Sequence, residues 1–211
     1  YALGVIGSNG GLPFRHDMLR QSDVIFYVGT RQGSVTTEKW TLPSDGEKTL
    51  VQLDVEPTRI GHNYQTAVGL VADAKRGLAA LVDEITDRLG GRPAARTAPD
   101  EVRRRRDAYM ASIEEFTSDR APIRSERFVA ELSRLLPPQS IICADPGTPC
   151  PYLSAYYQLP QAGRWFVSPR AHGALGYALP AVCGAYFARP DAARVVGVMG
   201  DGSFGISAGE L

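Results

Sequence analysis

Residues 195–211 read VVGVMGDGSFGISAGEL, an apolar run that meets a Gly-Asp-Gly-Ser turn at residues 200–203. The apolar run predicts a strand, and a helix is expected to follow the turn. In an open parallel sheet, ligands bind at the carboxyl ends of the strands, and Asp201 falls at such an end. The glycines on both sides of Asp201 allow a sharp turn and a close approach of the backbone to a ligand. The stretch therefore predicts a strand–turn–helix unit of an α/β fold, with a binding turn at its centre.

The turn combines a phosphate-binding feature with a carboxylate. Backbone N–H groups at Gly202 and Ser203, at the start of the expected helix, favour a phosphate. Asp201 would repel that phosphate unless a divalent cation lay between them, and Mg²⁺ prefers oxygen ligands of both kinds. The residues by themselves leave two interpretations open. One is a metal–diphosphate site, and the other is a simple strand-to-helix turn in which Asp201 is the N-cap.

In the rest of the chain, strands and helices also alternate, in two blocks that flank a polar connector. The expected strands are residues 22–29, 49–55, 140–145 and 194–199, and the expected helices are residues 72–89, 125–136 and 172–189. Gly90 is the expected C-cap of one helix and Ser125 the expected N-cap of another. Alternating strands and helices favour parallel sheets, so we predict an α/β protein with two parallel-sheet, three-layer domains. The domains are expected at residues 1–90 and 122–211, joined at residues 91–121 by a linker with a charged helix.

Composition and charge give no indication of a nucleic-acid or membrane protein. The 211 residues include 23 basic and 23 acidic side chains, so the formal net charge is zero. The arginines at residues 103–106 are followed by acidic residues, which favours a solvated linker helix over a nucleic-acid patch. No apolar run is long enough to span a membrane and the N-terminus lacks a signal-peptide pattern, so we expect a cytoplasmic protein. Cys143, Cys150 and Cys183 lack metal-ligand spacing and are expected to be reduced thiols.

Several longer segments resemble one enzyme family. The Gly-Asp-Gly turn after an apolar strand resembles the first half of the thiamine diphosphate signature. Residues 168–185 (SPRAHGALGYALPAVCGA) and 144–149 (ADPGTP) are similar to segments of acetolactate synthases and benzoylformate decarboxylases, and residues 22–31 and 51–74 are similar to the central domain of the same enzymes. The chain is thus identified as a member of the thiamine diphosphate-dependent family. It resembles the central domain followed by the first half of the cofactor-binding C-terminal domain.

This resemblance implies a set of cofactor-binding residues. The set is Thr148, Pro149, Gly173, Ala174, Leu175, Gly200, Asp201, Gly202 and Ser203. Asp201 would be a Mg²⁺ ligand, and Gly173 would offer its carbonyl to the aminopyrimidine ring. Leu175 would be the apolar wedge beneath the thiazolium, although by itself it also fits a core leucine. His172 is a candidate pocket residue because a histidine titrates near neutral pH, and the catalytic residues are otherwise unassigned.

A second nucleotide is implied for the first domain. Family members differ there, because some bind FAD, some bind ADP and some bind neither. Arg31, Asp54 and Asp73 are the candidate FAD contacts. The alternative is that they are an ordinary surface arginine and solvated acids of turns.

The activity implied by the resemblance is decarboxylation of a 2-oxo acid, with thiamine diphosphate as the electron sink, followed by acetolactate synthase-like carboligation. Pro149 and the Ala174-Leu175 pair depart from the usual residues of the family, so a simple decarboxylase or another carboligase or lyase stays open, as does a non-catalytic nucleotide-binding relative. A homodimer or homotetramer is implied. The Asn-Asn half of the metal motif would follow Leu211 and the domain with the activating glutamate would precede Tyr1, so we expect the chain to be part of a longer enzyme.

Overall fold

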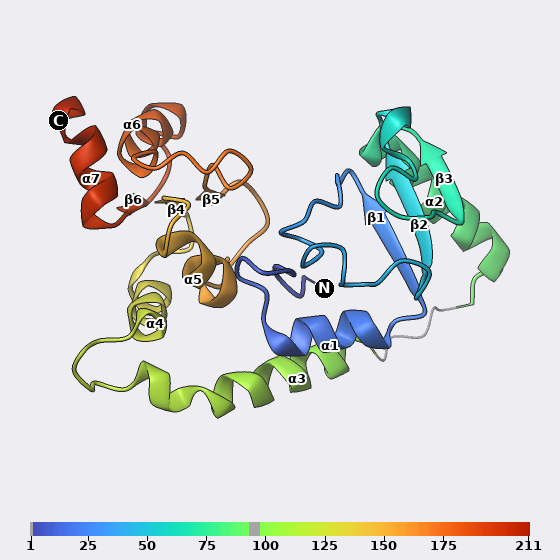
Figure 1. Ribbon diagram of the computed structural model, residues 1–211, viewed down its shortest axis with the longest axis horizontal. Coiled ribbons are helices and arrows are strands. Elements are labelled where there is room, and N and C mark those ends of the chain that lie inside the picture. The colour runs from blue at the N-terminus through green and yellow to red at the C-terminus, as the bar shows by residue number, and fades with distance from the viewer. Residues whose placement is uncertain (1, 93–97) are drawn as a thin grey trace. The chain divides into compact units, whose positions relative to one another are not determined.

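The computed structural model describes residues 2–92 and 98–211, and the chain divides into two compact units. Unit 1 comprises Tyr1–Ser8 and Leu12–Tyr109, and unit 2 comprises Asn9–Gly11 and Met110–Leu211 (Figure 1). Of the linker expected at residues 91–121, residues 93–97 lie outside the described residues. Each unit is built on its own three-stranded parallel sheet. The predicted α/β fold class, with two parallel sheets, is therefore confirmed.

Unit 1 carries the sheet order β1-β2-β3. Its elements are α1 (Pro13–Gln21), β1 (Val24–Val28), β2 (Thr49–Asp54), the 3₁₀ helix η1 (Pro57–Arg59), β3 (Val68–Val71) and α2 (Ala74–Leu89), followed by α3 (Ala98–Ser112), which runs across the boundary between the units. The register pairs Tyr27 with Gln52 and Gln52 with Gly69. Asp73 caps the start of α2 by accepting a hydrogen bond from the Arg76 N–H, and Gly90 ends it in the left-handed conformation, as expected.

The two faces of this sheet are covered differently. On one face Tyr27, Leu50 and Tyr64 form a buried cluster, in which the rings of Tyr27 and Tyr64 stack with centroids 6.3 Å apart. On the other face Leu53 packs against Gly77 of α2, and Figure 1 shows α2 lying along the sheet. Helix α2 therefore covers one face, and the loop that carries Tyr64 packs on the other.

The arginines of α3 are neutralised on their own helix. Each of the arginines at residues 103–106 pairs with an acidic neighbour, namely Asp100, Glu101 or Asp107. The helix also packs inside unit 1, where the rings of Tyr109 and Phe14 lie 5.4 Å apart. No helix in residues 2–92 and 98–211 combines the length and apolar character needed to cross a lipid bilayer.

Unit 2 carries the sheet order β5-β4-β6. Its elements are the 3₁₀ helix η2 (Glu114–Thr117), α4 (Ser125–Leu135), β4 (Ser140–Ala144), α5 (Pro149–Tyr156), β5 (Phe166–Val167), α6 (Ala178–Ala188), β6 (Arg194–Val198), α7 (Asp201–Ser207) and the 3₁₀ helix η3 (Ala208–Glu210). Ser125 is the first residue of α4 and Arg124 is the N-cap, so the expected N-cap was wrong by one residue.

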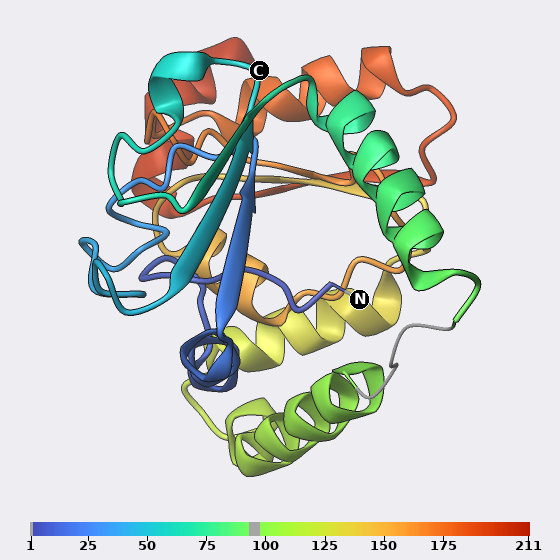
Figure 2. The same cartoon turned by 90° about the vertical axis from the view of Figure 1, so that its right-hand side faces the viewer.

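Alternation along β4 builds the three layers of unit 2, because successive side chains of a strand point to opposite faces. Ile142 and Ala144 pack with Val129 of α4 and Leu153 of α5. Ile141 and Cys143 pack with the apolar side chains of α6 and with Trp165. Figure 2 shows α6 on one side of this sheet and α4 on the other. Every residue of β4 is buried, as expected for the central strand of a parallel sheet.

The largest departure from the predicted elements is the start of α6. The helix expected from residue 172 begins at Ala178, and the preceding residues form a loop in which Gly173 and Gly176 have φ angles of +74° and +80°. Such angles are incompatible with a right-handed helix. The Asp145 carboxylate, fully buried after β4, accepts hydrogen bonds from the backbone N–H groups of Gly176 at 2.9 Å and Ala178 at 2.6 Å. These bonds fix both the loop and the first turn of α6.

Replacing Asp145 should therefore loosen this part of unit 2. Asp145→Asn keeps the shape but loses the charge and one acceptor oxygen, so we expect the free energy of unfolding to fall by about 2 to 4 kcal/mol, as for one or two hydrogen bonds to a charged group. Hydrogen exchange should show faster exchange of the Gly176 and Ala178 amides. Asp191→Asn, at an exposed Arg189 pair, is the matched control and should leave both amides protected. Unchanged exchange in the Asp145 variant would show that its carboxylate does not hold this loop.

The three free thiols should react at very different rates. Cys143 and Cys150 are buried and Cys183 is exposed, and burial raises the pKa of the Cys143 thiol to about 11. Because the thiolate is the reactive form, a disulfide reagent at pH 8 should label Cys183 quickly in the native monomer and all three thiols after unfolding. Cys183→Ser should remove the fast phase. A fast phase that survives this substitution would show that a buried thiol is accessible.

Candidate functional site

Three loops of unit 2 leave the carboxyl ends of adjacent parallel strands. The turn at residues 145–148 follows β4, the loop at residues 168–177 follows β5, and residues 199–200 lead from β6 into α7. The predicted thiamine diphosphate residues lie in these loops or at the start of the helices α5 and α7 that follow two of them. The parallel order β5-β4-β6 therefore brings segments that are more than 50 residues apart in the sequence to one edge of one sheet, where α/β proteins bind ligands.

The loop at residues 168–177 is fixed at both of its ends. Near its start Ser168 donates a hydrogen bond to the Cys150 sulfur (3.4 Å), and Arg170 donates to the Ser154 hydroxyl (3.5 Å), so it is tied to α5. At its end the Asp145 carboxylate holds it. Gly176 also accepts a 2.6 Å hydrogen bond from the Ser207 hydroxyl of α7 through its carbonyl. The loop is thus tied to the turn after β4 and to the last residue of α7.

No side chain could replace the hydrogen atom of Gly176 without a rearrangement. A Cβ atom there would lie 2.5 Å from Ser207 Oγ and 2.9 Å from Ile206 Cγ2. Its φ of +80° is a second reason for glycine. The close approach of this loop to α7 therefore depends on the residue type at position 176.

Asp201 does not cap α7. Gly200 is the N-cap and makes no side-chain bond, while Asp201 is the first helical residue and is exposed. The interpretation of Asp201 as an N-cap was therefore wrong. The first backbone bond of this turn is Phe204 N–H to Gly200 C=O at 2.9 Å, so the N–H groups of residues 201–203 have no acceptor among the described residues. Space is open in front of Gly200 and Gly202 as well, because a Cβ on either would meet nothing within 4 Å.

Leu175 lies at the same edge and is not a core leucine. Its side chain is 53% exposed, and a Cβ atom on Gly147 would lie 3.8 Å from Leu175 Cδ2. Thr148 is the N-cap of α5 without a side-chain cap bond, and Pro149 begins the helix. The turn after β4 and the loop after β5 therefore lie close to each other at Gly147 and Leu175. The Thr148 hydroxyl, which makes no cap bond, follows in the same turn.

The remaining predicted residues of this loop stand beside Leu175. Gly173 donates its N–H to the Pro169 carbonyl at 2.7 Å and has open space at its Cβ position. Ala174 is half-buried, and His172 is exposed, with no side-chain partner among the described residues. The structure thus brings His172 to the edge without engaging its imidazole.

These features fit a diphosphate and a cation. The unsatisfied N–H groups at the start of α7 suit phosphate oxygens, and the free Asp201 carboxylate suits Mg²⁺. The described residues contain no cluster of three or more His, Cys, Asp or Glu side chains that could hold a metal by themselves. A cation at Asp201 would accordingly share oxygen ligands with the diphosphate, which is how Mg²⁺ is commonly held.

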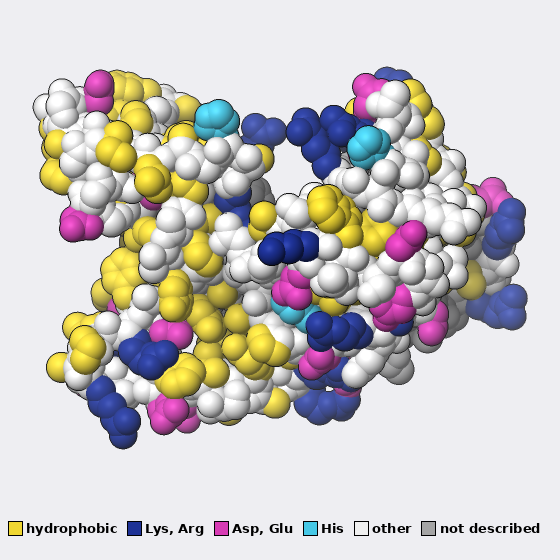
Figure 3. All heavy atoms as spheres, in the orientation of Figure 1, with side chains coloured by type: hydrophobic (Ala, Val, Ile, Leu, Met, Phe, Trp, Pro, Cys, Tyr) yellow, Lys and Arg dark blue, Asp and Glu magenta, His cyan; other side chains and the backbone are white. Residues whose placement is uncertain are grey.

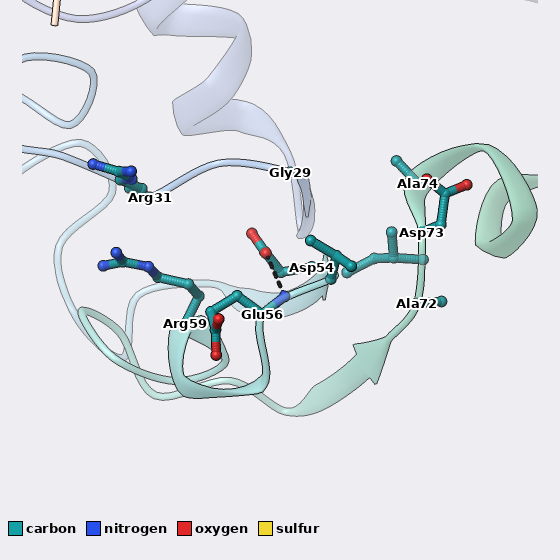
Figure 4. A pocket seen from close by; sticks show the side chains of 10 residues that line it. Gly29, Arg31, Asp54, Glu56, Arg59, Ala72, Asp73 and Ala74 are labelled. Carbon is teal, nitrogen blue, oxygen red and sulfur yellow. Dashed lines mark hydrogen bonds between the residues drawn. The ribbon is translucent and has the colours of Figure 1, made fainter.

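A second candidate site lies at the carboxyl edge of the unit 1 sheet. It is a pocket of about 470 Å³ that includes Arg31, Asp54 and Asp73, so the structure brings the three candidate FAD residues together. Figure 4 shows Asp54 and the two arginines, Arg31 and Arg59, at one end and Asp73 at the other. Asp54 is buried, unlike a solvated acid of a turn, whereas Asp73 is exposed and caps α2.

Sequence reasoning missed three residues of these sites. Asp145 was passed over because its partners lie 31 and 33 residues away in the sequence. Glu56 and Arg59, which line the unit 1 pocket, belong to a turn that reads as a simple strand connection. One signal was available for Arg59, namely Gln52, a polar residue in an otherwise apolar strand that donates to the Arg59 carbonyl at 2.9 Å.

Comparison with known proteins identifies both units. The thiamine pyrophosphate enzyme central domain matches residues 1–81, and the C-terminal TPP-binding domain of the same enzymes matches residues 145–211. These ranges contain the unit 1 pocket and the three edge loops of unit 2, respectively.

Individual relatives cover nearly the whole chain. It is 33% identical to a sulfoacetaldehyde acetyltransferase of Rhodobacter capsulatus over 99% of its length and 38% of the relative. It is 26% identical to a probable acetolactate synthase large subunit of Methanococcus aeolicus over 100% of its length and 36% of the relative. It is 28% identical to a probable 2-ketoarginine decarboxylase of Pseudomonas aeruginosa over 92% of its length and 33% of the relative. The chain thus spans between a third and two fifths of the length of these relatives, and it belongs to the thiamine pyrophosphate enzyme family.

Proposed function

We propose that the protein is a thiamine diphosphate- and Mg²⁺-dependent enzyme that decarboxylates a 2-oxo acid and joins the product to a second carbonyl compound, as acetolactate synthase does. The observation that carries the proposal is the state of the turn after β6. Asp201 is exposed and does not serve as a cap, and the N–H groups beside it are unsatisfied. Both groups are therefore free for a metal-bound diphosphate.

Each edge residue has a role in this proposal. Asp201 holds Mg²⁺, the N–H groups of Gly202 and Ser203 and the turn at Thr148 and Pro149 hold the diphosphate, and Gly173 offers its carbonyl to the aminopyrimidine. The exposed Leu175 orients the cofactor by steric contact, and Ala174 leaves room beside it. Bound thiamine diphosphate supplies an electron sink next to the reacting carbonyl. His172, free of partners at this edge, is the chain's candidate for holding or moving a proton.

Two further outcomes of the same chemistry are candidates. The 33% identity to a sulfoacetaldehyde acetyltransferase supports acetyl transfer with an aldehyde substrate. The identity to a probable 2-ketoarginine decarboxylase supports decarboxylation followed by protonation alone. All three outcomes use the same edge residues of unit 2, so the product distinguishes them.

We also propose that the pocket in unit 1 binds a nucleotide, with FAD as the first candidate. Its position at the carboxyl ends of parallel strands and its volume of about 470 Å³ support this assignment. Arg31 and the buried Asp54 reach the pocket from two neighbouring strands. Detection of flavin in the purified protein would support FAD over ADP.

A homodimer or homotetramer is the proposed assembly. Large apolar side chains lie exposed on α6 and α7, where Figure 3 shows hydrophobic groups at the surface. Tyr186 and Phe187 form an edge-to-face pair with centroids 5.5 Å apart, and Phe187 is 82% exposed. Contiguous exposed apolar surface of this kind is typical of association sites.

Charge placed on that surface should weaken the assembly. Phe187→Glu is expected to lower the molecular mass measured by sedimentation equilibrium, because a carboxylate would have to be desolvated in an apolar interface. Val82→Glu, on the exposed face of α2 in unit 1, is the matched control. If wild type sediments as a monomer, or if both variants behave alike, α6 is not the interface.

The cofactor proposal rests on Asp201 and is tested there. Mg²⁺ should raise the affinity of the purified protein for thiamine diphosphate, and Asp201→Asn should reduce this effect at least tenfold, because it removes the charged ligand of the cation. Asp191→Asn, an exposed acid that precedes β6, serves as the control. Thiamine diphosphate binding that is equally strong in EDTA, or equal in the Asp201 variant, would rule out the metal–diphosphate site.

Product analysis with pyruvate then tests the reaction. Acetolactate would support carboligation, acetaldehyde alone would support simple decarboxylation, and absence of turnover with bound cofactor would move the search to aldehyde substrates. Acid release and mass spectrometry of the same sample report thiamine diphosphate and any FAD.

A further inference from the structure

A single glycine connects the loop at residues 168–177 to the turn after β4 and to α7. Gly176 donates its N–H to the Asp145 carboxylate at 2.9 Å, and its carbonyl accepts a 2.6 Å hydrogen bond from the Ser207 hydroxyl. Its φ of +80° and the atoms around its Cβ position leave no room for a side chain. Gly176 is therefore held from two sides, and the residue before it in the sequence is Leu175.

The hydroxyl of Ser207 is directed away from its own helix. Thr86 of α2 and Ser133 of α4 donate to the carbonyl four residues earlier in their own helices, at 2.7 Å and 3.0 Å. Ser207 is the last residue of α7 and the N-cap of η3, where its side chain makes no cap bond in the described part of the chain. Its hydroxyl donates instead to Gly176, 31 residues earlier. The bond is therefore a tertiary contact and not part of the local hydrogen bonding of α7 or η3.

Leu175 is exposed on a segment that is anchored at both ends. Ser168 and Arg170 tie the start of the loop to α5, and Gly176 ties its end. Between these anchors the Leu175 side chain is 53% exposed, and Gly173 and Gly176 on either side of it both have positive φ angles. Because its own side chain is not packed in a core, the position of Leu175 is set by the backbone bonds of the loop.

Helix α7 relates Leu175 to the turn after β6. Asp201 is the first residue of this helix and Ser207 is the last, so at about 1.5 Å per residue the two are separated by about 9 Å along the helix axis. A shift of Gly176 relative to Ser207 would move Leu175 relative to the turn at Asp201. The hydrogen bond between Ser207 and Gly176 therefore fixes the spacing between Leu175 and this turn.

We propose that Ser207 is a positioning residue for the cofactor, because it holds Leu175 at a fixed spacing from the diphosphate turn through Gly176. The inference rests on the proposed thiamine diphosphate site and adds to it a residue that does not touch the cofactor. The turn at residues 201–203 binds its diphosphate with or without the Ser207 hydroxyl. The contribution of the cofactor's rings to the affinity depends on Leu175, and hence on Ser207.

The test compares inorganic pyrophosphate with thiamine diphosphate, each titrated into the purified protein at saturating Mg²⁺. Wild type should bind thiamine diphosphate at least tenfold more tightly, because pyrophosphate lacks the rings that reach Leu175. Ser207→Ala should weaken thiamine diphosphate binding by about threefold to tenfold, the effect of one neutral hydrogen bond, and leave pyrophosphate binding unchanged. A general loss of structure would weaken both ligands. Ser133→Ala, which removes a comparable hydroxyl bond from α4, is the matched control and should change neither affinity.

A double-mutant cycle with Leu175→Ala tests whether Ser207 acts through Leu175. Once the Leu175 side chain is removed, Ser207→Ala should have little further effect on the affinity for thiamine diphosphate, because residues that act together are not additive. Independent effects of the two substitutions would overturn the proposal.

Other outcomes separate this inference from the cofactor site itself. If wild type binds neither ligand, the cofactor site is wrong and the role of Ser207 is wrong with it. If wild type binds both ligands and the Ser207 variant keeps the wild-type preference, or loses affinity for both equally, the cofactor site stands and only the role of Ser207 is overturned. Equal affinity of wild type for the two ligands would likewise show that the Leu175 loop does not contribute.

Discussion

The buried carboxylate of Asp145 is the interaction on which the edge of unit 2 depends. A fully buried charge is unfavourable unless hydrogen bonds replace its hydration. Here the replacements are the N–H groups of Gly176 and Ala178, and the start of a helix supplies such groups without partners of its own. The same contact therefore replaces the hydration of the carboxylate and gives the N–H groups at the start of α6 an acceptor. It joins the end of β4 to the start of α6, so that residues 172–177 form a loop and not the first turns of that helix.

The cofactor segments and most of the strands could be predicted from the sequence, whereas the start of α6 could not, because a tertiary contact sets it. Four of the six strands were visible as apolar runs closed by turn residues, and β1, β2, β4 and β6 lie within two residues of the expected bounds. The short strands β3 and β5 were not predicted. Residues 172–177 have the small-residue composition of a helix, and only their tertiary partner prevents it. Local sequence supplies no sign that Asp145, some thirty residues earlier, accepts hydrogen bonds from this segment. Gly173 and Gly176 were the one local indication that this segment is not helical.

In the unit 1 pocket, too, some lining residues could be predicted from the sequence and others could not. Arg31, Asp54 and Asp73 were candidates because this part of the chain resembles the central domain of the family, and the structure places all three at one pocket. Arg59 sits on a short 3₁₀ turn whose position is set by the side chain of Gln52. A buried glutamine in a strand has to satisfy both ends of its amide, and doing so here fixes the turn. Its presence in TLVQLDV pointed to a partner, but the identity of that partner required the fold.

The two proposed anion sites would hold their ligands in opposite ways. Unit 2 offers backbone N–H groups and a carboxylate at Asp201, so its net local charge repels a diphosphate until a cation intervenes. Unit 1 offers two unpaired guanidinium groups, and its acids are held by backbone hydrogen bonds. Both arrangements arise from the same parallel-sheet edge. In the proposed site of unit 1 the arginine side chains would supply the positive charge, whereas in unit 2 a bound ion would have to supply it. Only the second site is therefore expected to depend on the availability of a metal.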